Sequence, residues 1–361
     1  MAASLVTRFS RYLYAEILPL YLAGLALLLL LLTGAFLLEV VAEVLARGAP
    51  VSLVAQYLLY SLPVAASSGI PLALLFASLL GLARISQDSE LKAARLLGLG
   101  PRQFLTPMLL LGLAVTALAI VNNEVVVPAS RQQALEVEKE MLLRSPETFI
   151  EEQAFFSDAL GRAIFIEQVL PGGRFEGVTV IQPGGPTGPR EVITAESGVY
   201  AEEQGVWNLE DLTLMVYREG RLVLDFEANS AVLPVRDLAA GVTGNPDPVH
   251  QPISTLIERL REDPERGNPA EWTALHRKLA EPLAATVFAV FALGVTMVGS
   301  RRGMSLGLVS VLVLTFVYYA TWSVTKLLGA QGTIPAWIAG WTPVSLYAVA
   351  AALLLARAWR R

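Results

Sequence analysis

Long apolar stretches separated by charged connections occupy both ends of the chain. The first, Ile17 to Leu38, holds no charged residue over about 22 positions, or roughly 33 Å of α-helix, which matches the ~30 Å hydrocarbon core of a bilayer. The second stretch, Gly48–Ala83, is too long for one span, so Pro50 and Pro63 are expected to divide a surface segment from a spanning helix at Leu62–Ala83. The further stretches are Phe104–Val121, Leu283–Val298, Ser305–Thr325 and Ala336–Ala356. The pattern predicts six membrane-spanning helices.

A polar block, residues 128–272, lies between the third and fourth apolar stretches. After a helical pattern at Ala129–Leu143, hydrophobic and polar residues alternate, as expected of strands. The alternating segments are Arg162–Val169, Phe175–Gln182, Arg190–Ser197, Val206–Arg218 and Arg221–Val235. Because no helix separates these segments, the block is expected to form an all-β sandwich or roll, like a jelly roll. A short charged helix, Ile253–Arg261, follows.

The fold class predicted from this order is a membrane helical bundle of three plus three helices with an inserted β domain. Residues 1–127 carry the first three helices and a surface helix at 86–100, and residues 273–361 carry the last three. Residues 128–272 form the β domain.

Composition and charge agree with a membrane location. Apolar residues make up 54% of the 361 residues and charged residues 16%, which is too apolar for an ordinary soluble domain. The net charge of -5 gives no indication of a nucleic-acid partner. Placing the amino terminus in the cytosol puts there the basic residues Arg8, Arg11, Arg84, Lys92, Arg95, Arg102, Arg301, Arg302, Arg357, Arg360 and Arg361. We therefore expect a multi-pass protein of the bacterial inner membrane, with both termini cytosolic and the β domain periplasmic.

The patterns that carry catalysis are missing from the sequence. None of the four lysines follows a glycine, so there is no P-loop to hold ATP phosphates. His250 and His276 lie outside any HExxH pattern, and the absence of cysteine excludes thiolate metal sites and disulfides. The one GxSxG match, Gly303–Gly307, follows a predicted membrane span and not a strand, so no nucleophile elbow is expected. We expect a non-catalytic chain that binds no metal and no cofactor.

The segment from Ser86 to Pro107 joins the second and third spans and is expected to hold the surface helix. Ser86 or Asp88 can cap its start, and Gly98 and Gly100 are typical of its end.

This helix carries the candidate partner contacts Glu90, Lys92 and Arg95. The alternative for Glu90 is a solvated acid at a helix start. The alternative for Lys92 and Arg95 is anchoring to lipid headgroups.

Three further polar groups lie where spans end. Glu39, Glu43 and Arg47 follow the first span at four-residue spacing and are candidates for substrate entry, with snorkelling at the interface as the alternative. Helix capping and headgroup contacts are expected for Asn122, Asn123, Glu124, His276, Arg277, Lys278 and Glu281. Trp322, Trp337 and Trp341 are expected to be aromatic-belt anchors.

Four segments together resemble the LptF/LptG family of lipopolysaccharide-export permeases, over nearly the whole chain. They are RYLYAEILP at Arg11–Pro19, SELKAARLLGLGPRQFLTP at Ser89–Pro107, FIEQV at Phe165–Val169 and LHRKLAEPLAATVFAVFAL at Leu275–Leu293. The resemblance implies six spans with a β-jellyroll after the third, and it fits either the F-type or the G-type subunit.

The resemblance also implies partners. It implies a paired permease, served by a cytosolic dimeric ABC ATPase that binds ATP and Mg²⁺, and a single-span jellyroll protein that receives the extracted lipid. Glu90 matches the acid of the family's coupling helix, and Lys92 and Arg95 fall in the same motif.

One departure from the family pattern concerns the substrate. Family members that handle phosphorylated lipopolysaccharide often have Lys or Arg on the outer half of the first span, where this chain has Glu39 and Glu43. The exact lipid therefore stays open, unless a companion subunit or a divalent ion supplies the positive charge. The alternative function is a membrane-anchored scaffold that transmits motion from the outer β domain.

Overall fold

The structure, a computed structural model, describes residues 2–36, 50–144, 155–157, 162–170, 174–183, 188–201, 206–218, 220–234, 247–262, 268–301 and 308–360. The chain packs into two compact units. The helical unit holds residues 1–33, 62–130 and 247–361, and the β unit holds residues 34–61 and 131–246. Glu39, Glu43 and Arg47 lie outside the described residues.

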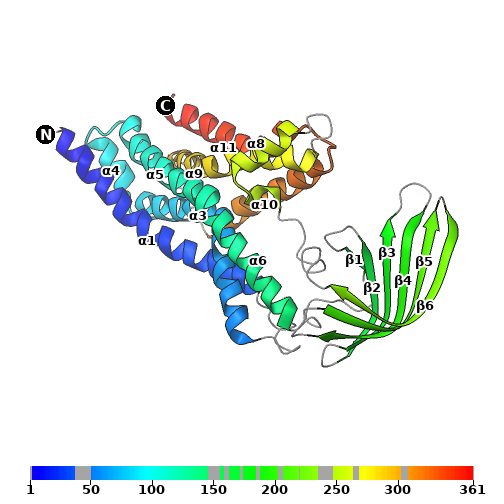
Figure 1. The fold of residues 1–361 in the computed structure, drawn as a ribbon. Helices are drawn as coiled ribbons and strands as arrows, with labels where there is room; N and C mark the ends of the chain where they lie inside the picture. The colour runs from blue at the N-terminus through cyan, green and yellow to red at the C-terminus, as the bar shows by residue number, and fades with distance from the viewer. Residues whose placement is uncertain are drawn as a thin grey trace. The chain divides into compact units, whose positions relative to one another are not determined.

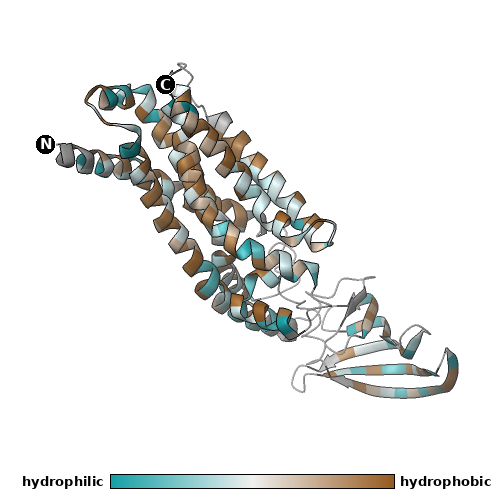
Figure 2. Cartoon of the chain, turned by 90° about the horizontal axis from the view of Figure 1, so that it is seen from above, coloured by the Kyte–Doolittle hydropathy of each residue, from teal (hydrophilic) through white to brown (hydrophobic). Residues whose placement is uncertain are grey.

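Six helices are long and apolar enough to cross a membrane, which confirms the predicted number. They are α1 (Ala2–Phe36), α3 (Val51–Gln87), α5 (Pro101–Val121), α9 (Pro269–Arg301), α10 (Leu308–Ala330) and α11 (Ala336–Trp359). Figure 2 shows apolar residues along these helices, in contrast to the alternating strands of the sheet. The chain therefore has a bundle of three plus three membrane helices with an inserted antiparallel sheet.

Helix α3 differs from the prediction. The prolines were expected to separate a surface segment from the span, but α3 continues through both Pro63 and Pro71. Proline removes one hydrogen bond from a helix, and a membrane helix tolerates this when neighbouring groups bind the affected backbone. The acceptor that Pro63 leaves free is the Leu59 carbonyl. The Pro63 carbonyl itself accepts from the Ser67 hydroxyl at 3.2 Å and from Asn122 Nδ2 at 3.0 Å, which joins α3 to the π-helical turn that follows α5.

The third span is also longer than predicted. Helix α5 continues without a break through a π-helical turn, η2 (Asn122–Val126), into α6 (Val127–Arg144). A π turn inserts one residue into the helix and turns the following side chains, and such turns are frequent at functional sites. It places Asn122 and Asn123 in buried positions.

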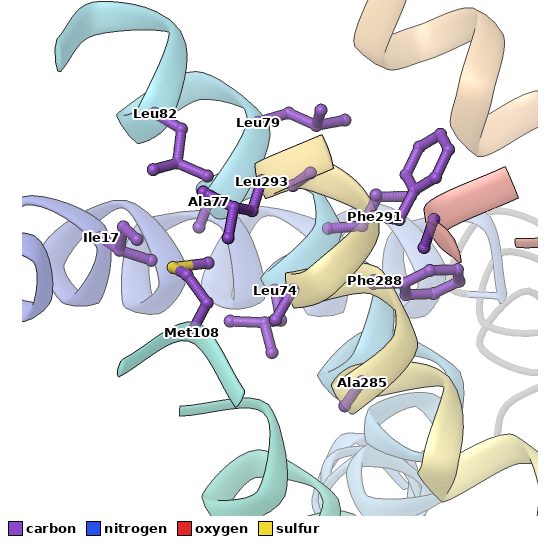
Figure 3. Close-up of a cluster of buried hydrophobic side chains, with 14 of the residues drawn as sticks. Ile17, Leu74, Ala77, Leu79, Leu82, Met108, Ala285, Phe288, Phe291 and Leu293 are labelled. Atoms are coloured by element: carbon purple, nitrogen blue, oxygen red, sulfur yellow. The ribbon is translucent and has the colours of Figure 1, made fainter. Parts of the chain in front are cut away.

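The core of the helical unit lies where α1, α3, α5 and α9 meet. Figure 3 shows Ile17, Leu74, Met108 and Phe288 from these helices converging on one cluster. The backbones of α5 and α9 come close at Gly112, where a Cβ atom would lie 2.7 Å from Thr286 Cα. One turn further along α5, the Thr116 hydroxyl donates to the Pro282 carbonyl at 3.0 Å. Small residues and hydroxyl bonds are the usual means of packing helices in a bilayer.

The helices are not equally buried. In the most apolar window of α3 and of α9, 61% of the residues are buried, against 17% in α1 and 11% in α10. Helices α3 and α9 therefore form the centre of the described bundle, and α1 and α10 present most of their apolar surface outward.

The β unit contains one six-stranded antiparallel sheet in the order β1-β2-β3-β4-β5-β6. The strands are β1 (Phe155–Ser157), β2 (Ala163–Leu170), β3 (Arg174–Pro183), β4 (Pro189–Ala201), β5 (Val206–Arg218) and β6 (Arg221–Pro234). Six or more strands were predicted and five of them were placed here. The position of β1 was not predicted, because three residues are too few to show alternation. Of the two predicted arrangements, sandwich or roll, the described residues agree with a roll, since each strand pairs with the next in a single curved sheet (Figure 1).

In one row of residues across the sheet, the alternation of buried and exposed positions changes phase. In β3 the buried residues are Phe175, Val178 and Val180, so the spacing changes from three to two beyond Gly177. In β5 the buried residues Trp207, Leu209 and Leu212 change their spacing at Asp211. Gly177 and Asp211 have left-handed backbone conformations, with φ of 65° and 50°. We call this row the sheet crease.

The crease keeps one apolar cluster on one face of the sheet. The cluster comprises Ile164, Ile166, Phe175, Val178, Val180, Ala195, Trp207, Leu209 and Leu212. Strict alternation would have moved the residues beyond the crease to the opposite face. The two left-handed residues prevent this.

Candidate functional site

The short helix between α3 and α5 is α4 (Glu90–Leu96), which is shorter than the predicted 86–100 because Ser86 and Gln87 belong to α3. Neither Ser86 nor Asp88 caps it. The residue before the helix is Ser89, which has φ 61° and makes no side-chain cap within the described structure. A left-handed residue between two helices turns the chain sharply, and this turn sets the direction of α4.

Helix α4 ends at Leu96, before the predicted residue 100, and Gly98 lies just beyond its end. Gly98 is left-handed, with φ 88°. The Leu99 amide donates to the Ala94 carbonyl at 3.1 Å and the Gly98 amide donates to the Arg95 carbonyl at 3.0 Å. This pair of bonds is a Schellman motif, in which glycine relieves the steric cost of the left-handed turn. Pro101 then begins α5.

Helix α4 buries one face and exposes the other. Leu91 and Ala94 pack into the core of the helical unit. Leu96 and Leu97 are 89% and 70% exposed, and Lys92 is exposed beside them. Arg95 is half-buried and has contacts of its own. A charged and apolar surface on a short, rigidly ended helix is suited to docking, not to catalysis.

The half-buried Glu90 side chain is held by a residue of the same chain. Tyr12 of α1 donates its hydroxyl hydrogen to Glu90 Oε2 at 2.7 Å. One helical turn further along α1, Glu16 forms an ion pair with Arg84 near the end of α3, with Nη1 and Oε1 2.6 Å apart. Sequence reasoning did not find this arrangement. The only signal was that Tyr12 and Glu16 lie in the RYLYAEILP segment, four residues apart and hence on one helix face.

At the other end of α5, charged residues are buried and paired. The Lys278 side chain is 1% exposed and contacts the Asn123 carbonyl oxygen at 3.2 Å. Its ammonium group also forms a close ion pair with Glu124 in the π turn. Glu124 in turn accepts a hydrogen bond from the Ile253 amide at 3.0 Å, at the start of α8 (Ile253–Glu262). A lysine this deeply buried does not contact lipid headgroups, so that expectation was wrong for Lys278.

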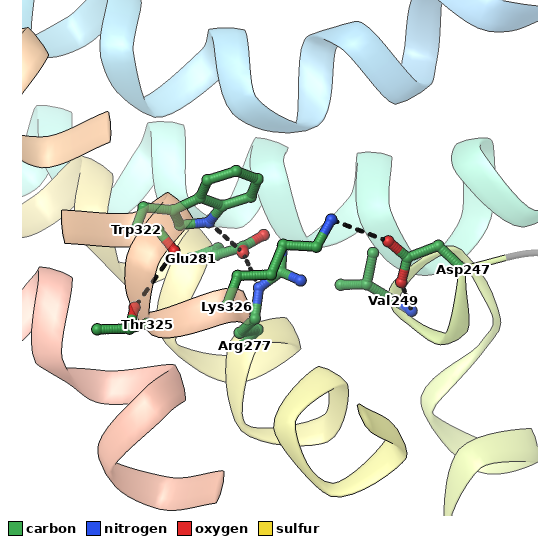
Figure 4. A network of polar contacts seen from close by, with 7 residues as sticks. All are labelled: Asp247, Val249, Arg277, Glu281, Trp322, Thr325 and Lys326. Atoms are coloured by element: carbon green, nitrogen blue, oxygen red, sulfur yellow. Dashed lines mark hydrogen bonds and ion pairs between the residues drawn. The ribbon is translucent and has the colours of Figure 1, made fainter. Parts of the chain in front are cut away.

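A second group of charges joins α9 to α10 (Figure 4). Arg277 Nε and Trp322 Nε1 both donate to Glu281 Oε1, at 2.7 and 2.8 Å. The Arg277 guanidinium lies 4.8 Å from the centre of the Trp322 ring, within the range of a cation–π interaction. Trp322 was expected to be an interface anchor, but its polar edge points to a carboxylate inside the bundle. We call Glu124, Arg277, Lys278, Glu281 and Trp322 the buried network.

The chain returning from the β unit is fixed beside this network. Asp247 lies before the short helix η4 (Pro248–His250) and forms an ion pair with Lys326 of α10 at 3.3 Å. Burial raises the pKa of Asp247, but the hydrogen bond from the Val249 amide and the positive charge of Lys326 outweigh it, so the pKa lies below its ordinary value. The carboxylate therefore stays charged and holds this segment to α10.

The geometry agrees with a comparison to known families. The family model for "Lipopolysaccharide export system permease LptF/LptG" matches residues 11–357, nearly the whole chain. The chain belongs to the LptF/LptG family. A search of curated proteins found no match.

Membership of the LptF/LptG family makes this chain a permease of lipopolysaccharide export and a component of a transporter. The six membrane helices agree with a multi-pass protein of the inner membrane. In the part of this LptF/LptG chain that the structure describes, no three His, Cys, Asp or Glu side chains are grouped to hold a metal ion.

Proposed function

We propose that this LptF/LptG chain is the permease subunit of an ATP-driven exporter that extracts lipopolysaccharide, or a related glycolipid, from the outer leaflet of the inner membrane. It passes the lipid to a periplasmic β-jellyroll bridge. ATP and Mg²⁺ bind to a separate ABC ATPase dimer, and this chain is not catalytic. Both termini and α4 face the cytosol, and the β unit faces the periplasm.

The observation that carries this proposal is the surface of α4. It combines the Glu90 carboxylate, the exposed Lys92 and the exposed pair Leu96 and Leu97 on one turn-bounded helix. An exposed leucine pair on a soluble loop costs free energy unless a partner covers it. An ATPase groove that accepts Leu96 and Leu97 and binds Glu90 and Lys92 through complementary charges supplies such a partner. We propose the half-buried Arg95 as a further contact of the same helix with the ATPase.

The β unit supports the transfer step. Its apolar cluster lies on one face of the sheet, and its last strand, β6, is an edge strand of 14 residues. Apolar side chains along β6 are exposed: Leu222, Val223, Leu224, Phe226 and Val232. Edge strands of this kind bind further strands. We propose that a single-span jellyroll protein adds its sheet to β6 and continues the apolar face.

A second six-span permease of the same family is proposed to face this chain. Helices α1 and α10 leave most of their apolar windows unburied, and a paired permease covers such faces around a cavity open to lipid. The cavity is needed because exposing an acyl chain to water costs about 0.8 kcal/mol per CH₂ group. A lipid with several chains therefore requires both a sheltered path and an energy source. The residues Glu39, Glu43 and Arg47 are proposed at its entry.

Gentle solubilisation followed by mass spectrometry of the intact complex tests these assignments. We expect two ATPase chains, a second six-span permease, a jellyroll protein and bound lipid. A chain that purifies without an ATPase favours the scaffold alternative, and ATP hydrolysis by the isolated chain contradicts the proposal.

A charge reversal tests Glu90 directly. Glu90→Lys is expected to lower the amount of co-purifying ATPase about tenfold or more, as loss of a central contact does. Asp88→Lys is the matched control, because it makes the same charge change two residues away at an exposed position. An equal loss in both variants assigns the effect to general charge and removes Glu90 from the docking surface.

A further inference from the structure

Helix α1 is attached to the bundle mainly through residues 9–24, which we call its attached end. Near its start, Leu13 and Ile17 are fully buried, and the Phe9 and Phe104 rings meet edge to face with centroids 4.9 Å apart. After Gly24, none of the described side chains of α1 is buried. Leu30, in the far half, is 68% exposed.

The attached end has two directional contacts with the α3–α4 region. These are the Tyr12–Glu90 hydrogen bond at 2.7 Å and the Glu16–Arg84 ion pair at 2.6 Å. Packed leucines resist separation of two helices but permit sliding, because dispersion has no preferred direction. Charge-assisted hydrogen bonds depend on angle as well as distance, so Tyr12 sets the register of α1 against α4 and Glu16 sets it against the end of α3.

We infer that Tyr12 and Glu16 are positioning residues that transmit a displacement of α4 to α1; we call the pair the α1 clamp. This inference rests on the proposed function, since it requires an ATPase that moves α4. It adds a role for the RYLYAEILP segment, which the docking surface does not use. Tyr12 binds Glu90 Oε2, and a carboxylate has a second oxygen that can accept a donor from the ATPase. Glu90 can therefore contact both at once.

The spacing of the clamp determines its effect. Two contacts four residues apart lie about 6 Å from each other along the helix, so they fix its tilt as well as its position. The part of α1 beyond the clamp is about 30 Å long. If α1 tilts as a rigid rod, a shift of about 1 Å between the two contacts becomes about 5 Å at its far end, and beyond Gly24 the described side chains are half-buried or exposed.

The experiment measures this movement in the complete complex. The natural chain has no cysteine, so Leu30→Cys on α1 and Leu346→Cys on α11 allow two spin labels at exposed positions. The distance between the labels is measured by pulsed electron resonance without nucleotide and with the ATPase trapped by vanadate. We expect trapping to shift this distance in the otherwise unchanged chain.

Tyr12→Phe combined with Glu16→Gln is expected to abolish the shift, while the ATPase still co-purifies in the normal ratio. Tyr14→Phe is the matched control, because it removes a hydroxyl of the same helix that donates to the Pro107 carbonyl of α5 at 3.2 Å. It is expected to keep the shift. The exchanged pair Glu16→Arg with Arg84→Glu, with Tyr12 intact, is also expected to keep it.

The results separate the clamp from the docking surface. A shift that persists in the double variant, or that Tyr14→Phe abolishes equally, overturns the clamp and leaves the proposed function standing. Loss of the shift in the exchanged pair also overturns the clamp. A wild-type chain that binds no ATPase overturns both.

Discussion

The charged side chains near the two ends of α5 differ in their exposure to solvent. At the α4 end, the ion pair of Arg84 and Glu16 is accessible, with the Arg84 side chain 68% exposed. At the π-turn end, the Lys278 and Arg277 side chains are 1% and 7% exposed, and each has a carboxylate partner. Buried pairs lock one arrangement because a lost partner leaves a charge without solvent, whereas a pair open to solvent orients its helices but contributes little free energy. The first end is therefore suited to a moving contact and the second to a fixed one.

The largest effect is expected from breaking the deepest pair. Lys278→Met leaves Glu124 without its cation and is expected to lower the free energy of unfolding by about 3–5 kcal/mol. Thermal unfolding in detergent measures the loss. Lys278→Met with Glu124→Gln removes both charges and is expected to recover most of it. If the double variant is as unstable as the single one, packing and not charge is the cause.

A smaller loss is expected from the indole contact. Trp322→Phe keeps a ring near Arg277 but removes the donor to Glu281, at an expected cost of about 1–3 kcal/mol. Trp337→Phe, at a position 60% exposed, is the control and is expected to change unfolding little. Equal effects of the two substitutions would show that Trp322 acts only as an apolar residue.

Much of this architecture could be predicted from the sequence because apolar length and alternation act locally. The six spans and five of the strands are patterns within single segments. The sheet crease could not be predicted in this way. Gly177 in β3 and Asp211 in β5 interrupt the alternation on either side of β4, and the meaning of that interruption depends on the register that aligns them through β4.

The candidate site shows the same limit. Glu90 was found because it belongs to a motif, but its contact with Tyr12 joins residues 78 positions apart. Lys278 and Trp322 were assigned to the membrane interface because polar residues at span ends usually lie there. The continuation of α5 through the π turn brought Glu124 to Lys278 instead.

Acid is expected to weaken the Asp247 contact. The pKa of Asp247 is lowered in the folded chain, so its stabilisation is complete above the ordinary value of about 3.9 and is lost as the pH falls through the folded pKa. Asp247→Asn is therefore expected to lower the free energy of unfolding by about 1 kcal/mol or less at pH 7, because the pair is partly exposed. The difference in melting temperature between the wild type and this variant should shrink toward pH 3. A difference that is the same at both pH values would contradict the ionic role.

The smallest effect on stability is expected from Arg84→Gln. The Arg84 side chain is 68% exposed and the Glu16 side chain 15%, so one partner stays in solvent and the loss should cost about 0.5 kcal/mol or less. Unfolding of Arg84→Gln beside Lys278→Met compares the two ends directly. A loss at Arg84 as large as that at Lys278 would remove the distinction between a moving and a fixed end.

The sheet crease has a consequence for an acyl chain that moves along the β unit. The bend is made by left-handed residues within the strands. The apolar face of the sheet therefore continues across the bend, from Ile164 to Trp207. If each strand were instead interrupted at the bend, a loop with solvated backbone groups would lie there. Hydrocarbon moving past this bend meets no such barrier. Replacing Gly177 by a bulky residue would set its Cβ 2.5 Å from Glu167 Oε2, on the side away from the apolar cluster, and would therefore strain the bend itself.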